Sequence, residues 1–400
     1  RTRREALGGY LPRRAVPPST LKAPAAAIFE TFDTGSNGRA LSTTTAMVRL
    51  LTKLLKDPEV GNDVVPIVPD EARTFGMDAL FKVAGIYSPD GQRYTPVDAE
   101  ALNSYREAID GQILQEGICE AGAIASFIAA GTAYATFAVP TIPFYIFYSM
   151  FGFQRVGDMI WASADMMARG FLLGGTAGRT TLNGEGLQHQ DGHSPILAST
   201  VPSVRTYDPA FAWELAILVQ YGISRMFIED HDELFYLMMY NEALPMPPRP
   251  ELSDLEAGVI RGGYCLDAAV GEGPRINLLG SGTILFEVIE AASRLRQEGF
   301  AVAVYSITSY IELARDAERA SYSNETSWLS HLFSEPGVPT IAASDYVRTL
   351  PRMIASWVPG PMVALGTDGF GMSERREALR AHFRIDAPAI AEAARSLVNV

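Results

Sequence analysis

Cysteine is nearly absent from this chain of 400 residues, which contains two cysteines, Cys119 and Cys265. Two cysteines cannot build the disulfide framework of a small secreted domain, and they are too few for a metal cluster held by thiolates. The sequence therefore excludes both classes of protein. This sparse use of cysteine fits a protein of the reducing cytoplasm.

Positive charge is also in short supply, because 33 lysines and arginines face 46 aspartates and glutamates, giving a formal charge of −13. A negative balance of this size gives no electrostatic support for a nucleic-acid partner, and we expect none. Hydrophobic residues make up 48% of the chain and charged residues 20%, as in ordinary globular proteins.

Several well-known catalytic motifs are missing: the sequence has no P-loop, no complete dinucleotide fingerprint and no G-x-S-x-G elbow. The Gly-Ser-Gly at 280–282 follows a predicted strand and opens a predicted helix, so it could cradle a phosphate, but a tight turn is the favoured interpretation. His189 and His193 have the spacing of two metal ligands on one helix face. The glycines around them indicate a loop, so we predict no metal site there.

A long stretch without formal charge separates Glu120 from Arg155. Its length would allow a membrane span. Gly122, Gly131 and two prolines interrupt it, however, and its first half is rich in small residues. We therefore predict a small-residue helix over about 118–132 and a buried strand over about 141–147, because buried parallel strands also form continuous apolar runs. No membrane partner is expected.

Strands alternate with helices on both sides of a proline-rich segment, ALPMPPRPELSD. This pattern predicts an α/β fold of two three-layer domains with mostly parallel sheets. The expected boundaries are a tail at 1–28, a first domain at 29–244, a linker at 245–251 and a second domain at 252–400. Before the linker we predict a helix capped by Ser42–Thr45, strands within 63–76, 170–176 and 232–240, and helices at 152–168 and 208–225. After it we predict strands at 275–280, 301–307, 339–344 and 362–367, and helices at 283–297, 309–320, 345–357, 374–382 and 387–398.

Glu120 is the strongest candidate for chemistry, because it stands where an apolar run begins and a buried carboxylate is costly without a partner. One interpretation is a helix-initiating glutamate satisfied by backbone donors and the helix dipole. The other is a half-buried carboxylate that exchanges a proton with a bound heterocycle. The aromatic residues at the far end of the run would then form a wall: Tyr145, Phe147, Tyr148 and Phe151.

Two loops supply further polar candidates. Asp70, Glu71 and Arg73 follow a predicted buried strand, where open α/β sheets bind ligands, although they could equally form a surface ion cluster. The glycine-rich loop at 180–194 carries a second group that suits either a polar active-site loop or solvated histidines. Its members are Glu185, His189, Asp191 and His193.

Several long motifs, in order along the chain, carry a family resemblance: ILQEGICEAGA, PFYIFYSMFGFQR, RTTLNGEGLQHQDGHS and LGTDGFGMSERREALRAHF. REALGGYLP near the start and YSITSYIELARD in the second half add to them. Together they resemble the homodimeric bacterial pyruvate dehydrogenase subunit that uses thiamine diphosphate. The resemblance implies that the first domain is the pyrimidine-binding domain and the second a transketolase-type C-terminal domain.

The resemblance also implies roles for individual residues. Glu120 matches the glutamate that hydrogen-bonds the aminopyrimidine ring of the cofactor, Phe151 the aromatic that packs on this ring, and Tyr148 and Ile118 the lining of the same wall. Three further matches are Glu71 near the reacting carbon, His189 near the active centre, and Glu185 among the cofactor-side residues at the subunit contact.

The family reaction is the oxidative decarboxylation of pyruvate, with transfer of the acetyl group to the lipoyl group of a dihydrolipoyl acyltransferase. Thiamine enzymes hold Mg²⁺ and the diphosphate with a Gly-Asp-Gly … Asn-Asn motif, which this sequence lacks. We therefore expect the diphosphate and metal ligands to lie outside this chain, in an N-terminal region before Arg1 or in a second copy. Two alternatives remain: a transketolase-like or other 2-oxo-acid thiamine enzyme, and a non-catalytic dimerisation piece.

Overall fold

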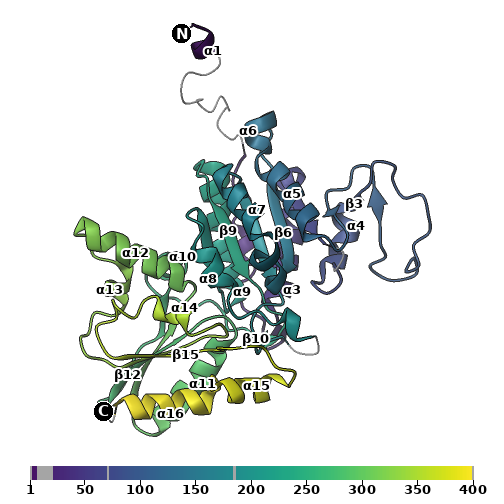
Figure 1. Cartoon of the computed structure of the whole chain (residues 1–400). Coiled ribbons are helices and arrows are strands. Elements are labelled where there is room, and N and C mark those ends of the chain that lie inside the picture. Colours follow the sequence, from purple (N-terminus) through teal and green to yellow (C-terminus); the bar gives the residue numbers. More distant parts are fainter. Residues whose placement is uncertain (1, 7–20, 70–71, 183–185, 399–400) are drawn as a thin grey trace.

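The computed structural model describes residues 2–6, 21–69, 72–182 and 186–398. Most of their strands gather into two sheets, each covered by helices (Figure 1). The first sheet has six strands, all paired in parallel. In spatial order they are β5 (Leu114–Gln115), β2 (Val64–Val68), β6 (Ile142–Tyr148), β7 (Gly170–Gly175), β9 (Leu234–Met238) and β8 (Val204–Tyr207).

The second sheet has five strands, of which four pair in parallel. Its edge strand β11 pairs antiparallel to β13. The spatial order is β11 (Tyr264–Asp267), β13 (Ala301–Ser306), β12 (Arg275–Gly280), β14 (Thr340–Ala343) and β15 (Met362–Leu365). Two minor two-stranded sheets complete the list: β1 (Ala40–Leu41) with β10 (Leu244–Pro245), and β3 (Ile86–Tyr87) with β4 (Glu107–Ala108).

The longer helices are distributed over both sheets. Those of the first half are α3 (Thr43–Leu54), α5 (Glu120–Gly131), α7 (Phe153–Asp165) and α9 (Ala212–Ile223), and those of the second half are α11 (Ile284–Gln297), α12 (Tyr310–Ser323), α15 (Arg376–Phe383) and α16 (Ala387–Val398). Shorter helices are α1 (Thr2–Ala6), α2 (Ala27–Glu30), α4 (Phe81–Ala84), α6 (Ala133–Phe137), α8 (Ser194–Ser199), α10 (Leu255–Arg261), α13 (Trp328–Leu332) and α14 (Thr349–Arg352).

Side chains alternate across the strands, so neighbouring residues enter opposite layers. In β6, Phe144 and Ile146 pack in the core that contains α3 and α9, whereas Tyr145 and Phe147 pack in the core that contains α5. Each sheet is thus buried on both faces, which is why its strands read as continuous apolar runs. The predicted architecture of two mostly parallel α/β units is confirmed.

The charge-free stretch folds largely as predicted, with α5 followed by β6, and the short helix α6 lies between them. Within the described ranges, no helix is both long enough and apolar enough to cross a membrane. The predicted cap of α3 is also present, because the hydroxyl of Ser42 accepts a hydrogen bond from the amide of Thr45 at 3.0 Å.

One predicted helix is largely absent, and another is confirmed with a later start than predicted. The helix expected at 345–357 is reduced to the four-residue α14, because the residues before it bond to other segments: the amide of Thr367 donates to the carbonyl of Tyr346 at 2.9 Å. The helix expected at 208–225 begins only at Ala212, since the amide of Asp208 donates to the carbonyl of Thr308 at 2.7 Å. A π-helical turn, Ser224–Ile228, then extends it.

Buried polar contacts join the two sheets. The carboxylate of Asp345, which follows β14, accepts hydrogen bonds from the amides of Thr180 and Thr181 at 2.8 and 3.1 Å. Both threonine hydroxyls donate to it as well, at 2.7 and 2.6 Å. Burial raises the pKa of Asp345 above its usual value, against these bonds. The start of the glycine-rich loop is thereby fixed to the second sheet.

The proline-rich segment is bound to the first half of the chain. The carbonyl of Met246 accepts a hydrogen bond from the amide of Ser36 at 3.0 Å, and the amide of Arg249 donates to the carbonyl of Asp33 at 2.8 Å. Met246 is also buried in the core. This segment therefore packs against the protein, and the boundaries expected at 1–28, 29–244, 245–251 and 252–400 stay predictions.

Candidate functional site

The carboxyl ends of the parallel strands lie at one edge of the first sheet, the usual place for a ligand in such folds. Tyr148 ends β6, and Phe151 ends the following 3-10 turn, Ser149–Phe151. The imidazole of His189, in the turn Leu187–His189, lies with its centre 4.9 Å from the ring of Tyr148 and 5.0 Å from that of Phe151. These three rings form the aromatic cluster of the candidate site.

Glu120 is the first residue of α5, whose N-cap is Cys119. Its side chain is 12% exposed and forms an ion pair with Arg155, at 2.8 Å between Oε1 and the guanidinium nitrogen. Within the described residues this is the only hydrogen-bond or ion-pair partner of the Glu120 side chain. The carboxylate is therefore held by a guanidinium at the positive end of a helix, and no described residue hydrogen-bonds its second oxygen.

Arg155 connects this carboxylate to the aromatic cluster. Its guanidinium carbon lies 3.8 Å from the centre of the Phe151 ring, within the range of a cation–π contact. The side chain is 49% exposed. Arg155 is not among the residues predicted from the sequence, and its one distinguishing signal there is its position as the first formal charge after the apolar stretch.

The predicted aromatic wall divides into two parts. Tyr148 and Phe151 are half-buried and meet His189, whereas Tyr145 and Phe147 are fully buried beneath them. The hydroxyl of Tyr145 donates to the backbone carbonyl of Glu120 at 3.4 Å, which ties the core to the start of α5. Burial, with the nearby Glu120 charge, raises the pKa of Tyr145.

The other sequence candidates have different positions. Ile118 is 69% exposed, and Glu71, Asp70 and Glu185 lie outside the described residues. Arg73 forms an ion pair with Asp98. Ile118 is therefore mostly exposed to solvent, and its role in lining the aromatic wall stays a prediction.

Asp191 and His193 stabilise the loop. Asp191 is fully buried and accepts hydrogen bonds from the amides of His193 and Ser194 at 2.9 and 3.0 Å, at the start of α8, and from the hydroxyl of Ser149. The Nε2 atom of His193 lies 3.5 Å from the side-chain amide of Gln154. No group of three potential metal ligands occurs within the described ranges.

The Gly-Ser-Gly turn is not a phosphate cradle. A Cβ atom added at Gly282, where φ is +48°, would come within 2.4 Å of the hydroxyl of Tyr240 and 2.7 Å of the carboxylate of Asp208. Burial raises the pKa of Asp208 to about 7. A phosphate here would meet a carboxyl group in a filled space, so the tight-turn interpretation is confirmed.

Comparison with known proteins identifies the relatives of this chain. The family model for the pyruvate dehydrogenase E1 component middle domain matches residues 24–247, and that for the transketolase-like C-terminal domain matches residues 262–386. The pyruvate dehydrogenase E1 component of Corynebacterium glutamicum is 49% identical over 399 residues, which cover 97% of this chain and 43% of that protein. The chain thus spans less than half the length of the curated relatives it matches.

Solved structures show the same fold. The transketolase from Leishmania mexicana superposes with a TM-score of 0.69 at 17% identity, covering 94% of this chain and 48% of that chain. A split-gene transketolase, titled an inactive β4 tetramer, has a TM-score of 0.60 at 17% identity, covering 90% of this chain and 99% of that chain. At such identities the comparison shows the fold alone. The resemblance seen in the motifs is confirmed by the middle-domain model, which matches more than half of the chain, and the protein therefore belongs to the pyruvate dehydrogenase E1 component family.

Proposed function

We propose that this chain supplies the pyrimidine half of a thiamine diphosphate site in a pyruvate dehydrogenase of the cytoplasm. The overall reaction would decarboxylate pyruvate oxidatively and pass the acetyl group to the lipoyl group of a dihydrolipoyl acyltransferase. One observation carries the proposal: the Glu120 carboxylate lies at a helix start, 2.8 Å from Arg155, whose guanidinium covers the ring of Phe151.

The residues present fit an aminopyrimidine ring in their chemistry. Such a ring has a nitrogen in its plane that can share a proton with a carboxyl group, and two flat faces that pack on aromatic side chains. Glu120 offers the carboxyl group, while Phe151 and Tyr148 offer the ring faces. When bound, thiamine diphosphate would supply the carbon nucleophile and the electron sink that pyruvate decarboxylation requires.

The protein would contribute position and proton control. Arg155 engages Oε1 of Glu120 and thereby orients the carboxyl group, so that Oε2 can hold a proton against the ring nitrogen. His189, packed on both aromatic rings, would present its imidazole next to the reacting centre. Glu71 and Glu185 remain proposed members of the site near the reacting carbon and the subunit contact.

The diphosphate and Mg²⁺ would be held elsewhere. The chain has neither a Gly-Asp-Gly nor an Asn-Asn sequence, the motif with which thiamine enzymes hold this metal. We propose that an N-terminal diphosphate-binding region or a second copy completes the site, because ligand pockets commonly form between domains.

A second candidate function is non-catalytic. The split-gene transketolase that matches this chain over nearly its whole length is titled inactive. A protein of the same extent and fold can thus exist as an assembly without activity, and this chain on its own could be such a piece.

A titration separates these functions. Thiamine diphosphate and Mg²⁺ are added to the protein, alone and with a diphosphate-binding region supplied in trans, and carbon dioxide release from pyruvate is measured. Saturable, cofactor-dependent release from pyruvate, without turnover of ketose phosphates, supports the proposal. Turnover of ketose phosphates instead would make it a transketolase-like enzyme, and inactivity in both settings would favour the non-catalytic piece.

A further inference from the structure

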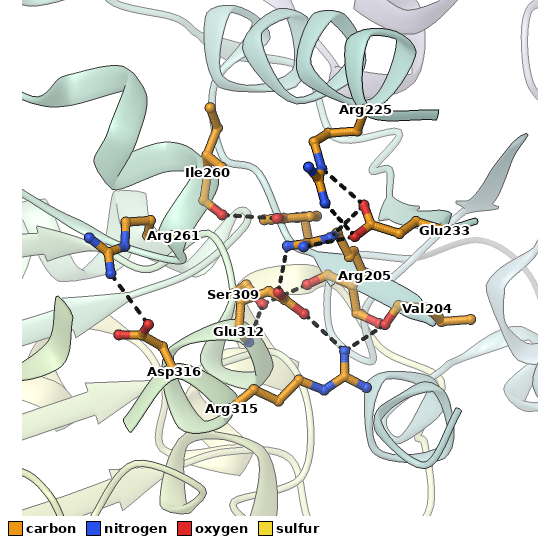
Figure 2. Close-up of polar contacts among 12 residues, drawn as sticks. Val204, Arg205, Arg225, Glu233, Ile260, Arg261, Ser309, Glu312, Arg315 and Asp316 are labelled. Atoms are coloured by element: carbon orange, nitrogen blue, oxygen red, sulfur yellow. Dashed lines mark hydrogen bonds and ion pairs between the residues drawn. The ribbon is translucent and has the colours of Figure 1, made fainter. Parts of the chain in front are cut away.

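A second polar pocket lies between the two sheets, and none of its lining residues belongs to the candidate site. It is a cavity of about 280 Å³ between β8, α10 and α12. Figure 2 shows the polar contacts of several of its lining residues. Four arginines and two carboxylates line it: Arg205, Arg261, Arg315, Arg319, Glu312 and Asp316. The lining therefore carries a formal charge of +2, in a chain whose overall charge is −13.

The two inner arginines are fixed by the fold. Arg205 forms ion pairs with Glu233 at 2.9 Å and with Glu312 at 3.0 Å. Arg315 donates to Glu312 at 2.9 Å and to the backbone carbonyls of three residues at 2.7–3.1 Å: Ser199, Val201 and Val204. Their guanidinium groups thus supply fixed positive charge but have few donors left for a ligand (Figure 2).

The two outer arginines retain donors. Within the described residues, the side chains of Arg261 and Arg319 each make one hydrogen bond, and both go to the same oxygen of Asp316, at 3.3 and 2.6 Å. The second oxygen of Asp316 accepts from the amide of Trp328 at 2.6 Å. A guanidinium group has five N–H donors, so most of those on Arg261 and Arg319 remain unused.

Neighbouring carboxylates do not cancel this charge. Glu233, which pairs with Arg205, is shared with Arg225, and Arg225 also pairs with Glu229. Counted together with these partners, the arginines still exceed the carboxylates by one. Positive charge that is not fully paired with carboxylates attracts anions, and it does so more strongly where the charged groups are partly buried, as Arg205 and Arg315 are.

We propose that this pocket binds a small phosphate-bearing anion, either free phosphate or the phosphate group of a small metabolite. The negative charge of a phosphate group is complementary to the net positive charge of the lining, and the guanidinium fork matches the geometry of phosphate oxygens. A cavity of this size holds a phosphate group and a few further atoms. Because Arg205 belongs to the first sheet and the other three arginines to the second half of the chain, the bound anion would strengthen the contact between the two halves.

Calorimetric titration with inorganic phosphate and with glycerol phosphate, against chloride at equal ionic strength, tests the proposal. The test variant is the double substitution Arg261→Gln and Arg319→Gln, and the control is Arg294→Gln, which removes a charge from an exposed ion pair with Glu290 on α11. We expect saturable binding to the unmodified protein and the control, weakened roughly tenfold or more in the double variant. Saturation by inorganic phosphate alone would identify free phosphate as the ligand.

Thermal unfolding gives a second readout, since a ligand of the folded state raises the unfolding temperature. Phosphate should raise it in the unmodified protein and in Arg294→Gln, and less in the double variant. If the double variant does not fold, Arg319→Gln alone replaces it, because that side chain is 66% exposed. The proposal is overturned if the unmodified protein shows no saturable binding, or if the variants bind phosphate equally well. It does not depend on thiamine chemistry.

Discussion

Asp208 should make the stability of the protein fall as the pH rises. This carboxyl group is buried where the first half of the chain meets the second, and one of its oxygens accepts a hydrogen bond from the hydroxyl of Tyr240. Burial raises its pKa from the ordinary 3.8 to about 7. The folded state therefore binds a proton that the unfolded state releases between these two values, and the free energy of unfolding decreases over this range.

The magnitude follows from the linkage relation. A change of pKa from 3.8 to about 7 corresponds to about 4 kcal/mol, since one pKa unit is worth about 1.4 kcal/mol. The variant Asp208→Asn has no titrating group at this position, so its free energy of unfolding does not show this decrease. Its free energy of unfolding, relative to the unmodified protein, should therefore increase by up to about 4 kcal/mol between about pH 4 and about pH 8.

Urea unfolding at a series of pH values measures this difference. Asp368→Asn serves as the control, because the pKa of Asp368 is shifted in the opposite direction. Burial raises this pKa, but the hydrogen bonds and charge of Arg348 lower it below its usual value. Its contribution is present above the ordinary pKa and is lost as the pH falls through the lowered one. A stability difference between Asp208→Asn and the unmodified protein that does not change with pH would refute the reasoning.

Two further variants test the packing between the two halves of the chain and the candidate site. Gly282→Ala should destabilise the protein by about 3 kcal/mol or more in urea unfolding, because its Cβ would lie 2.4 Å from the Tyr240 hydroxyl. The control Gly38→Ala, at a residue with φ +77° and open space around it, should cost only about 1 kcal/mol. Equal losses of stability in the two variants would contradict the packing argument. In the active assembly, Arg155→Gln should weaken thiamine diphosphate binding roughly tenfold in calorimetry, because Glu120 loses the guanidinium that orients it. Stability should change little, because an ion pair with a half-exposed arginine contributes about 0–1 kcal/mol to folding. Unchanged affinity in that variant would remove Arg155 from the site.

Much of the fold was predictable because its local patterns agree with its tertiary structure. The small-residue helix and the apolar strand of the charge-free stretch became α5 and β6, since β6 is buried along nearly its whole length and one face of α5 packs in the core. Glu120 could be singled out for the same reason: a charge at the edge of an apolar run is conspicuous.

The rest depended on contacts between distant segments. The edge strand β8 has four residues and no clear pattern of its own, and it was missed. The helix expected at 345–357 fails because Asp345 is bound by Thr180 and Thr181, about 165 residues earlier in the chain. The ion pair of Arg155 with Glu120 likewise joins the start of α7 to the start of α5, which no local pattern records.

The most direct test of the central claim is pyruvate turnover by the active assembly carrying Glu120→Gln, with Glu290→Gln, an exposed ion-pair residue on α11, as the matched control. The account predicts that Glu120→Gln lowers turnover by a factor of about 100 or more, as removal of a group that controls a proton does, while the unfolding midpoint changes little. The control variant should retain full activity. Turnover by Glu120→Gln within about twofold of the unmodified assembly would contradict the assignment of Glu120 as the proton-controlling carboxylate.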